Sequence, residues 1–325
     1  MDHSCKVSVI VPIFNMELYL ADCLKSIQEQ TLREIEIICI NDGSSDASQR
    51  ILEEHAAADA RIVIISRENR GVAYSRNEGM AAARGQYIAF MDPDDYYPAP
   101  DILEYLYTKA EENGVLISGG ERSFFSPEEP TPSQAYPPRY AAYIFQREGV
   151  MPFAEYQFDY GFTQYLYDRK MLLDNKITFP PYSRFQDPPF FVRAMIQAGK
   201  FYAAKRIAYA HRIDYKSNTW SDEKRSHAFQ GVYDVWQLAV RHKLDTLKRY
   251  VWDHLVTFIW YTKGKMTPAE REMVLSIENA IFKLDRPWWK NIIYKRRTRL
   301  NSNARLIYFL GMKKEYEKNT PAKTI

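Results

Sequence analysis

Residues 86–97 read QYIAFMDPDDYY, and this stretch decides how the chain around it is organised. Residues 87–91 form an apolar run of strand length, and Asp92, Asp94 and Asp95 follow at once. Three like charges so close together repel one another, so they are costly unless a positive group, most simply a divalent metal beside a phosphate, lies among them. The same letters are typical of an ordinary polar turn, because Asp and Pro are common turn residues. The stretch alone leaves both interpretations open.

The first hundred residues alternate between strand-like and helical patterns. Apolar runs of strand length occupy residues 7–13, 35–40, 62–65 and 87–91, and helical spacing occupies residues 20–27, 47–58 and 73–83. Strands that are apolar on both faces, separated by helices, predict a mostly parallel α/β sheet covered by helices. Ligands bind such open sheets at the carboxyl ends of the strands, so the residues just after each strand are the candidates for a site.

Polar residues follow three of these predicted strands. The first is followed by Asn15, the second by Asn41 and Asp42, and the third by a segment that leads into a helix with Arg76 and Asn77. Turn and helix-cap preferences account for Gly43 and Asp46. Asp42 differs, because a carboxylate directly at the end of a strand can accept hydrogen bonds from a ligand.

Three segments together resemble family 2 glycosyltransferases, which have the GT-A fold. They read VSVIVPIFN, IICINDGSSD and ENRGVAYSRNEGMAAARGQYIAFMDPDD, and they follow one another in the family's order over roughly the first hundred residues. The resemblance implies an enzyme that binds a nucleotide sugar and a divalent metal, Mn²⁺ or Mg²⁺. Neither a glycine-rich dinucleotide fingerprint nor a P-loop is present in the sequence.

The resemblance also implies roles for single residues. Asp42 would accept the N–H of a uracil or other base, and Asp92 would face the ribose. Asp94 would bind the metal, while Asp95 receives no role. The remaining implied nucleotide-binding positions are Pro12, Phe14, Asn15, Arg70, Gly71 and Asn77.

The next hundred residues are expected to complete the same domain and to bind the acceptor. A helix is predicted over 101–113, a strand over 115–118 and an irregular excursion over 119–138, which is rich in Pro, Ser and Glu. Aromatic residues are dense over 136–167. Such rings can stack on sugars, but we expect most of them to be ordinary packing.

The stretch SRFQDPPFF, residues 183–191, contains the candidate catalytic base. Asp187 followed by two prolines is typical of a helix N-cap, which would explain the Asp without catalysis. The family resemblance instead implies that Asp187 takes a proton from the acceptor. Gln186 stands where the family usually has Glu, which removes one charge.

His211 is a further candidate metal ligand. It lies in IAYAHRI, which resembles a family strand near the end of the domain, with His in a variant position. The alternative is that His211 is a packed or surface histidine, which is the more common situation.

The last hundred residues, 221–325, are predicted to be helical. Within them, residues 286–314 hold nine Lys or Arg and no Asp or Glu, interleaved with Trp, Tyr and aliphatic residues. This pattern is typical of an interfacial helix on anionic lipid, such as the inner face of a cell membrane. A C-terminal helix that packs on the domain and solvates its charges would have the same pattern.

Composition limits the remaining possibilities. The 325 residues carry a net charge of only +3, so no nucleic-acid partner is expected. Cys5, Cys23 and Cys39 have no metal-type spacing and predict free thiols in a reducing compartment. With no signal-peptide pattern and no apolar stretch of membrane-spanning length, we expect a cytoplasmic protein. The alternative is a cytoplasmic protein that binds peripherally to the membrane through residues 286–314.

The sequence therefore predicts three parts: a nucleotide-sugar-binding half (1–118), an acceptor-binding half (119–220) and a helical region (221–325). The predicted function is an inverting, metal-dependent glycosyltransferase that moves a sugar from a nucleotide diphosphate, with UDP preferred, to a hydroxyl of a glycan or polyprenol-linked acceptor, as in surface polysaccharide synthesis. Because of Gln186, the alternative is a catalytically silent sugar-nucleotide-binding or scaffolding protein of the same fold.

Overall fold

The computed structural model describes residues 5–126, 144–213, 221–261 and 266–284. The chain divides into two compact units, Met1–Asn218 and Thr219–Ile325, which are described here separately. The basic segment 286–314 and residues 127–138 of the expected excursion lie outside the described residues.

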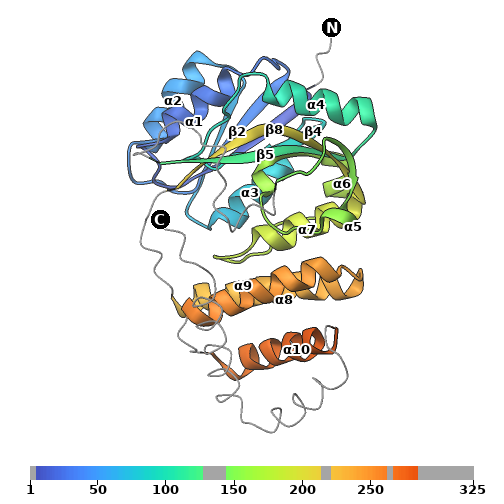
Figure 1. The fold of residues 1–325 in the computed structure, drawn as a ribbon. Helices are drawn as coiled ribbons and strands as arrows, with labels where there is room; N and C mark the ends of the chain where they lie inside the picture. The colour runs from blue at the N-terminus through green and yellow to red at the C-terminus, as the bar shows by residue number, and fades with distance from the viewer. Residues whose placement is uncertain (1–4, 127–143, 214–220, 262–265, 285–325) are drawn as a thin grey trace. The chain divides into compact units, whose positions relative to one another are not determined.

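The first unit is built on an eight-stranded sheet with the order β3-β2-β1-β4-β7-β5-β8-β6 (Figure 1). The pairs β3–β2, β2–β1, β1–β4 and β5–β8 are parallel, and β7 and β6 pair with their neighbours antiparallel. The sheet is therefore mostly parallel, as predicted. Its strands are β1 Val7–Ile13, β2 Ile35–Asn41, β3 Ile62–Ser66, β4 Tyr87–Phe90, β5 Ile117–Phe125, β6 Gly149–Pro152, β7 Tyr165–Asp168 and β8 Lys200–Arg212.

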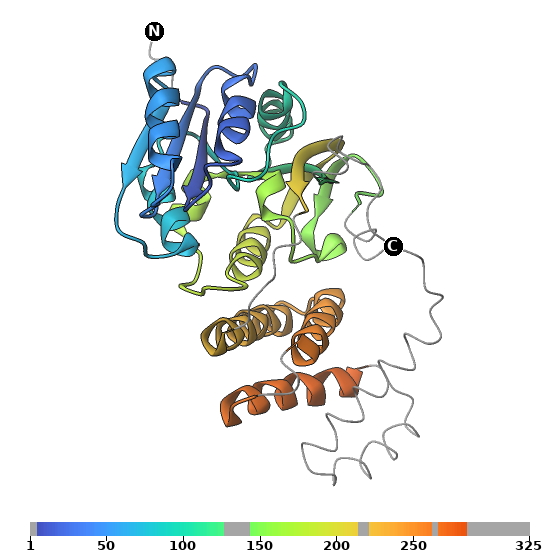
Figure 2. The same ribbon diagram turned by 90° about the vertical axis from the view of Figure 1, so that its left-hand side faces the viewer.

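Helices cover both faces of the sheet (Figures 1 and 2). One face packs against α1, α2 and α4, and the other against α3 and α7. The helices of this unit are α1 Leu20–Gln28, α2 Ser48–Ala58, α3 Val72–Ala82, α4 Ile102–Asn113, α5 Phe153–Tyr156, α6 Arg169–Asp174 and α7 Asp187–Ala198, with a short 3-10 helix, η2, at Phe162–Gln164. The predicted alternation of the first hundred residues is confirmed to within about two residues at each boundary.

The expected irregular excursion is wrong at its beginning. Residues 119–125 continue β5 as a regular strand beside β8. Gly119 and Gly120, which suggested a loop, are needed for close packing. A Cβ on Gly119 would lie 2.0 Å from the Tyr165 ring, and one on Gly120 would lie 2.5 Å from the backbone oxygen of Arg206. The pairing with β8 is irregular at these glycines, since the register shifts between Gly119 and Glu121 and again between Glu121 and Arg122, as in a β-bulge.

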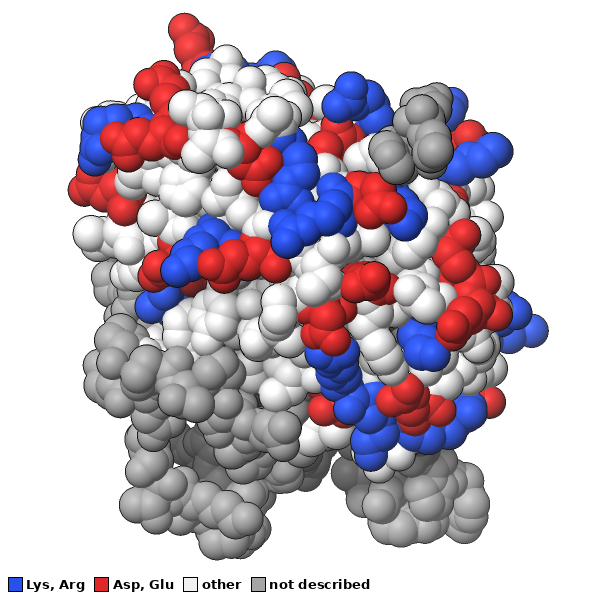
Figure 3. Space-filling model, turned by 90° about the horizontal axis from the view of Figure 1, so that it is seen from above, with Lys and Arg blue, Asp and Glu red and all other residues white. Residues whose placement is uncertain are grey.

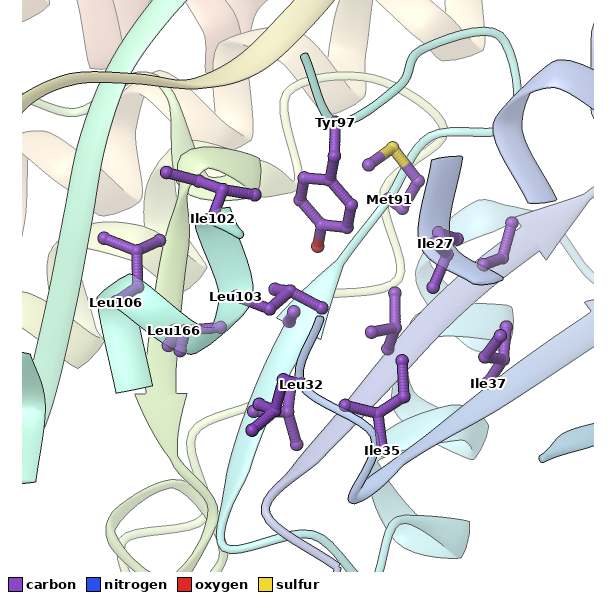
Figure 4. Close-up of a cluster of buried hydrophobic side chains, with 14 of the residues drawn as sticks. Ile27, Leu32, Ile35, Ile37, Met91, Tyr97, Ile102, Leu103, Leu106 and Leu166 are labelled. Atoms are coloured by element: carbon purple, nitrogen blue, oxygen red, sulfur yellow. The ribbon is translucent and has the colours of Figure 1, made fainter. Parts of the chain in front are cut away.

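A hydrophobic core lies between the sheet and the helices α1 and α4 (Figure 4). Leu20, Leu24 and Ile27 of α1 are completely buried in it, at the helical spacing that the sequence showed. Tyr97 also enters this core, and its hydroxyl points among apolar side chains. That hydroxyl is buried and has no hydrogen-bond partner among the described residues. Most aromatics between 145 and 167 are likewise buried, as expected for packing.

The strand β7 joins the two predicted halves of the first unit. It lies between β4 and β5 and pairs with both, so that Leu166 is opposite Ala89 on one side and Ser118 on the other. The edge of the first half of the sheet is thus closed by residues from the second half.

In the second unit the described residues form the helices α8 Asp222–Arg241, α9 Asp245–Tyr261 and α10 Pro268–Leu284. They pack on one another, and Val232, Val235, Trp236 and Ala239 are buried in α8, which confirms the predicted helical spacing. None of the helices in the described ranges is both long and apolar enough to cross a bilayer. Figure 3 shows the first unit from above the view of Figure 1, and on this face basic and acidic side chains alternate in small groups.

Candidate active site

The candidate residues gather at the carboxyl ends of the parallel strands. The strands β2, β1 and β4 are neighbours and run in the same direction, so the residues that follow them share one edge of the sheet. The end of β8 reaches the same region, because Tyr96, just after the acidic stretch, forms a bridge with Ala210. The topology thus brings together three segments that are far apart in the sequence.

Asp42 lies at the end of β2 and is buried. Its Oδ1 accepts a hydrogen bond from the Arg70 N–H at 2.9 Å, and its Oδ2 accepts one from the Gly71 N–H at 2.7 Å. The Arg67 Nε lies 3.1 Å from Oδ1. The carboxylate therefore fixes the loop that leads into α3. Its expected contact with a nucleotide base stays a prediction.

The loop after β1 offers an exposed ring beside a fixed backbone. Pro12 is buried within β1, whereas Phe14 is 45% exposed. Asn15 adopts a left-handed conformation (φ 54°), and its Oδ1 accepts a hydrogen bond from the Ser45 N–H at 2.8 Å. This ties the β1 loop to the β2 loop. The Phe14 ring is therefore available to stack on a planar ligand at this edge.

The loop before α3 has a stacked cation at its surface. The Arg70 guanidinium lies 4.0 Å from the centre of the Tyr74 ring, which is 43% exposed. Gly71 has φ +91°, a conformation that side chains rarely adopt, and this lets its N–H point at Asp42. Asn77 uses its amide differently, since it donates to the Phe179 carbonyl and accepts from the Phe179 N–H. Asn77 thus links α3 to the segment before α7.

Arg76 is a residue of the candidate site to which the sequence analysis assigned no role. Its Nη2 donates to Asp92 Oδ1 at 2.7 Å, and its guanidinium lies over the rings of Phe162 and Phe179 at 4.6 and 5.2 Å. The side chain is 5% exposed, and its Nε and Nη1 are buried without a hydrogen-bond partner among the described residues. The signal in the sequence was weak: Arg76 stands at helical spacing from Ala73 and Met80, which are also buried in α3.

Asp187 is the first residue of α7, and the predicted N-cap role is wrong. The cap position is Gln186, and no side chain makes a cap hydrogen bond there. Removal from water raises the pKa of Asp187 above its ordinary value, although the positive charges of Arg76 and Arg122 act in the opposite direction. A carboxyl group with a raised pKa is a better proton acceptor than an exposed one. Gln186 itself is buried.

Asp94 is the acid with an available carboxylate. Its side chain has a hydrogen bond from its own backbone N–H and no hydrogen bond or ion pair with any other described residue. Removal from water, followed by the charges of Asp95 and Asp92, raises the pKa of Asp94 to about 6. Its backbone carbonyl accepts a hydrogen bond from Arg212 Nε at 3.0 Å, which fixes the turn. Asp94 therefore has the chemistry of a group that needs a cation.

The other two acids have partners within the protein, and the positive group expected among the acids is supplied for Asp92 by Arg76. Asp95 is completely buried and receives hydrogen bonds from the Tyr209 hydroxyl, the His211 ring and the Arg212 backbone N–H. Only Asp94 has no such contact in the described part of the chain.

His211 lies beside this turn and is 38% exposed. Its ring contacts Asp95, the residue next to Asp94 in the turn, and Arg212, the residue after His211, donates to the Asp94 carbonyl. In the described ranges there is no group of three or more His, Cys, Asp or Glu side chains arranged to hold a metal. Asp94 and His211 could supply one oxygen and one nitrogen, a donor set that suits Mn²⁺, while a bound diphosphate would supply further oxygens.

Comparisons with known proteins identify the family to which the chain belongs. The family model described as "Glycosyl transferase family 2" matches residues 8–174, just over half of the chain. The chain is 35% identical over 216 residues to "Uncharacterized glycosyltransferase EpsJ" of Bacillus subtilis (strain 168), which covers 66% of this chain and 62% of that protein. The chain therefore spans less than two thirds of this relative.

Two solved structures are similar in fold. The structure of S. aureus TarS 1–349 in complex with UDP-GlcNAc has a TM-score of 0.63 at 19% identity, over 84% of this chain and 79% of that one. The mannosyltransferase PcManGT from Pyrobaculum calidifontis, in complex with GDP-Man and Mn²⁺, has a TM-score of 0.57 at 15% identity, over 94% and 86%. The predicted fold class is confirmed.

Proposed function

Because this chain belongs to glycosyl transferase family 2, we propose that it is an inverting, metal-dependent glycosyltransferase. It would move a sugar from a nucleotide diphosphate to a hydroxyl of a glycan or polyprenol-linked acceptor. UDP is the preferred nucleotide in this proposal, because a carboxylate such as that of Asp42 can accept the uracil N–H.

The donor would bind across the ends of β1, β2 and β4. In this proposal the base stacks on Phe14 and lies against the β1 and β2 loops that Asn15 joins. Arg70 and Gly71 line the same edge, because Asp42 holds their backbone. Asp92 faces the ribose, and Asn77 supports this edge from behind through Phe179.

Asp94 and His211 would hold the metal. When bound, a divalent metal offsets the charge that develops on the departing diphosphate. The fit rests on the chemistry of these two side chains: Asp94 has no side-chain partner among the other described residues and has a raised pKa, and His211 contacts the adjacent Asp95.

Asp187 would take the proton from the acceptor hydroxyl as that oxygen attacks the sugar carbon. Because the attack and the departure of the diphosphate form one displacement, the configuration of the sugar carbon is inverted. Arg76 links the donor and acceptor parts of this proposed site, since it pairs with Asp92 and its positive charge lowers the pKa of Asp187. Its hydrogen bond holds the Asp92 carboxylate in place while Asp187 accepts the proton on the acceptor side.

One observation carries this proposal. Of the three acids in the DPDD turn, two have partners within the protein, and the third, Asp94, has no side-chain partner among the other described residues and has a pKa raised to about 6. A turn that served only to connect two elements would not need a desolvated acid of this kind.

The test combines binding and transfer. Calorimetry with UDP should detect binding that Mn²⁺ strengthens, and transfer from a panel of UDP-sugars should stop after exhaustive chelation and return when Mn²⁺ is added. NMR of the product should show inversion. Retention, or full activity after chelation, contradicts the mechanism. Binding without turnover over a broad acceptor panel favours the catalytically silent alternative.

The place of action is part of the proposal. The basic segment 286–314 would bring the enzyme to anionic lipid, where a polyprenol-linked acceptor is found. Co-sedimentation with vesicles that contain anionic lipid, compared with neutral vesicles, tests this. Equal binding to both would exclude it.

A further inference from the structure

Asp95 has a set of contacts that the proposed chemistry does not yet use. Its Oδ2 accepts a hydrogen bond from the Tyr209 hydroxyl at 2.7 Å and lies 2.9 Å from His211 Nδ1. Its Oδ1 accepts one from the Arg212 backbone N–H at 2.8 Å. The carboxylate is completely buried, so these contacts with the end of β8 fix it in one orientation.

This arrangement determines where the proton of the His211 ring lies. An ionised carboxylate only accepts hydrogen bonds, so the contact with Asp95 requires a proton on His211 Nδ1. In a neutral imidazole the lone pair is then on Nε2, at the edge of the ring away from Asp95. The ring is also held edge-on against Phe124, with centres 5.8 Å apart and planes at 85°. His211 is therefore fixed in both tautomer and direction.

We propose that Asp95 is a positioning residue that holds His211 in the Nδ1–H tautomer and so presents the Nε2 lone pair to the metal beside Asp94. Histidines that bind metals generally donate their second ring N–H to a carboxylate or carbonyl, which fixes the ring and raises its basicity. The inference rests on the proposed metal role of His211, but the tautomer can be measured without any turnover.

The variant Asp95→Asn gives a sharp test because an amide has one acceptor and one donor. If its oxygen faces the Arg212 N–H, its NH₂ group faces Tyr209 and His211. The NH₂ group can then only donate to Nδ1, which would move the ring proton to Nε2. The opposite orientation places two donors, the NH₂ group and the Arg212 N–H, against each other. The first orientation is therefore expected, and it blocks Nε2.

The matched control is Tyr209→Phe. It removes the hydrogen bond to the same Oδ2 atom, and also the one that the Tyr209 hydroxyl accepts from the Asp92 backbone N–H, but leaves the contact between Asp95 and His211 in place. Any general loosening of the buried turn should occur in this variant as well. A change of tautomer should not.

The tautomer is measured by NMR on metal-free full-length protein with ¹⁵N-labelled histidine, at a pH of about 8, above the usual histidine pKa of about 6.5. The His211 signals are identified by their loss in His211→Gln. Wild type and Tyr209→Phe should show the Nδ1–H form, and Asp95→Asn the Nε2–H form. Calorimetry with Mn²⁺ in the presence of UDP should show affinity about 10- to 100-fold weaker in Asp95→Asn, with Tyr209→Phe close to wild type.

The wild-type spectrum alone can overturn the proposal, so the proposal does not depend on the folding of any variant. An Nε2–H tautomer in a wild-type protein that binds Mn²⁺ would exclude the role of Asp95 and leave the metal dependence intact. A wild-type protein that shows the Nδ1–H tautomer but does not bind Mn²⁺ would exclude His211 as a metal ligand, and with it the metal dependence of the proposed function. A variant that inverts the tautomer but keeps its Mn²⁺ affinity would also overturn the inference.

Discussion

Replacing Asp42 by Asn should destabilise the protein even when no nucleotide is present. The sequence predicted a contact with the base, whereas the structure shows that both carboxylate oxygens hold the loop before α3. These two roles predict different results. A residue that only contacts the base changes nucleotide affinity alone, while a residue that fixes the loop also changes the free energy of unfolding.

The magnitude follows from the contacts. The amide of Asn keeps the size of the side chain, but its NH₂ group must face one of the two backbone N–H donors. One hydrogen bond to a charged group is lost, which costs about 1.5–3 kcal/mol, and the ion pair with Arg67 goes with it. Arg67 keeps Glu78 and Ser75 as partners, so we expect a total loss of about 2–3 kcal/mol. For a unit of this size that corresponds to a fall in Tm of about 4–10 °C.

Urea unfolding and thermal unfolding, both without nucleotide, measure this loss. The matched control is Glu68→Gln, which removes the same charge from an exposed position in the same loop and should change the unfolding free energy little. Calorimetry with UDP then measures the effect on binding separately. An Asp42→Asn protein that unfolds like wild type in the absence of nucleotide, or a Glu68→Gln protein that loses as much stability, would refute the reasoning.

Three further predictions concern single side chains. Tyr97→Phe removes a buried hydroxyl that has no described partner, so it should raise the unfolding free energy by about 1 kcal/mol, and a loss in urea unfolding would contradict this. Burial raises the pKa of Glu36, but hydrogen bonds from Ser8 and Arg84 outweigh it and leave that pKa below its ordinary value. Glu36 therefore stabilises the fold above the unfolded-state pKa of about 4.3, and the stability difference between wild type and Glu36→Gln should shrink as the pH falls below about 4; a constant difference would exclude this linkage. Asp187→Asn should lower kcat about 10²- to 10⁴-fold without weakening UDP binding, and in the wild type the acid limb of the pH profile of kcat/KM should lie above the ordinary pKa of Asp. The control is Asp174→Asn, which changes an exposed acid. Near-wild-type turnover of Asp187→Asn would exclude Asp187 as the catalytic base.

Local patterns were sufficient to predict most of the fold. The strands and helices up to residue 113 follow from hydrophobic periodicity, since each buried face recurs at the spacing of its element. The failure at 119–125 has a physical cause. Gly119 and Gly120 have the composition of a loop, but they are small because Tyr165 and β8 approach them closely. Both partners are distant in the sequence, so no local window contains this information.

The position of a site residue was predictable where the strand that positions it lies directly before it in the sequence. The acids of the DPDD turn and Asp42 stand directly after strands, so their place at the sheet edge could be inferred. The different partners of the three acids could not be inferred from the sequence. They are Arg76 for Asp92 and Tyr209 and His211 for Asp95, and the last two lie more than a hundred residues away. Asn77 shows the same limit, because its partner Phe179 is equally distant.

The position of β7 has a consequence for how the protein is made on the ribosome. β4 emerges early, but the strand that pairs with its free side is about 75 residues further along the chain. During that interval the nascent chain has an open, apolar strand edge, which is the kind of surface that recruits another chain. A ribosome that paused before residue 168 would hold this edge open longer. Slow codons or truncations between β5 and β7 should therefore reduce the yield of soluble protein more than the same changes placed after β8.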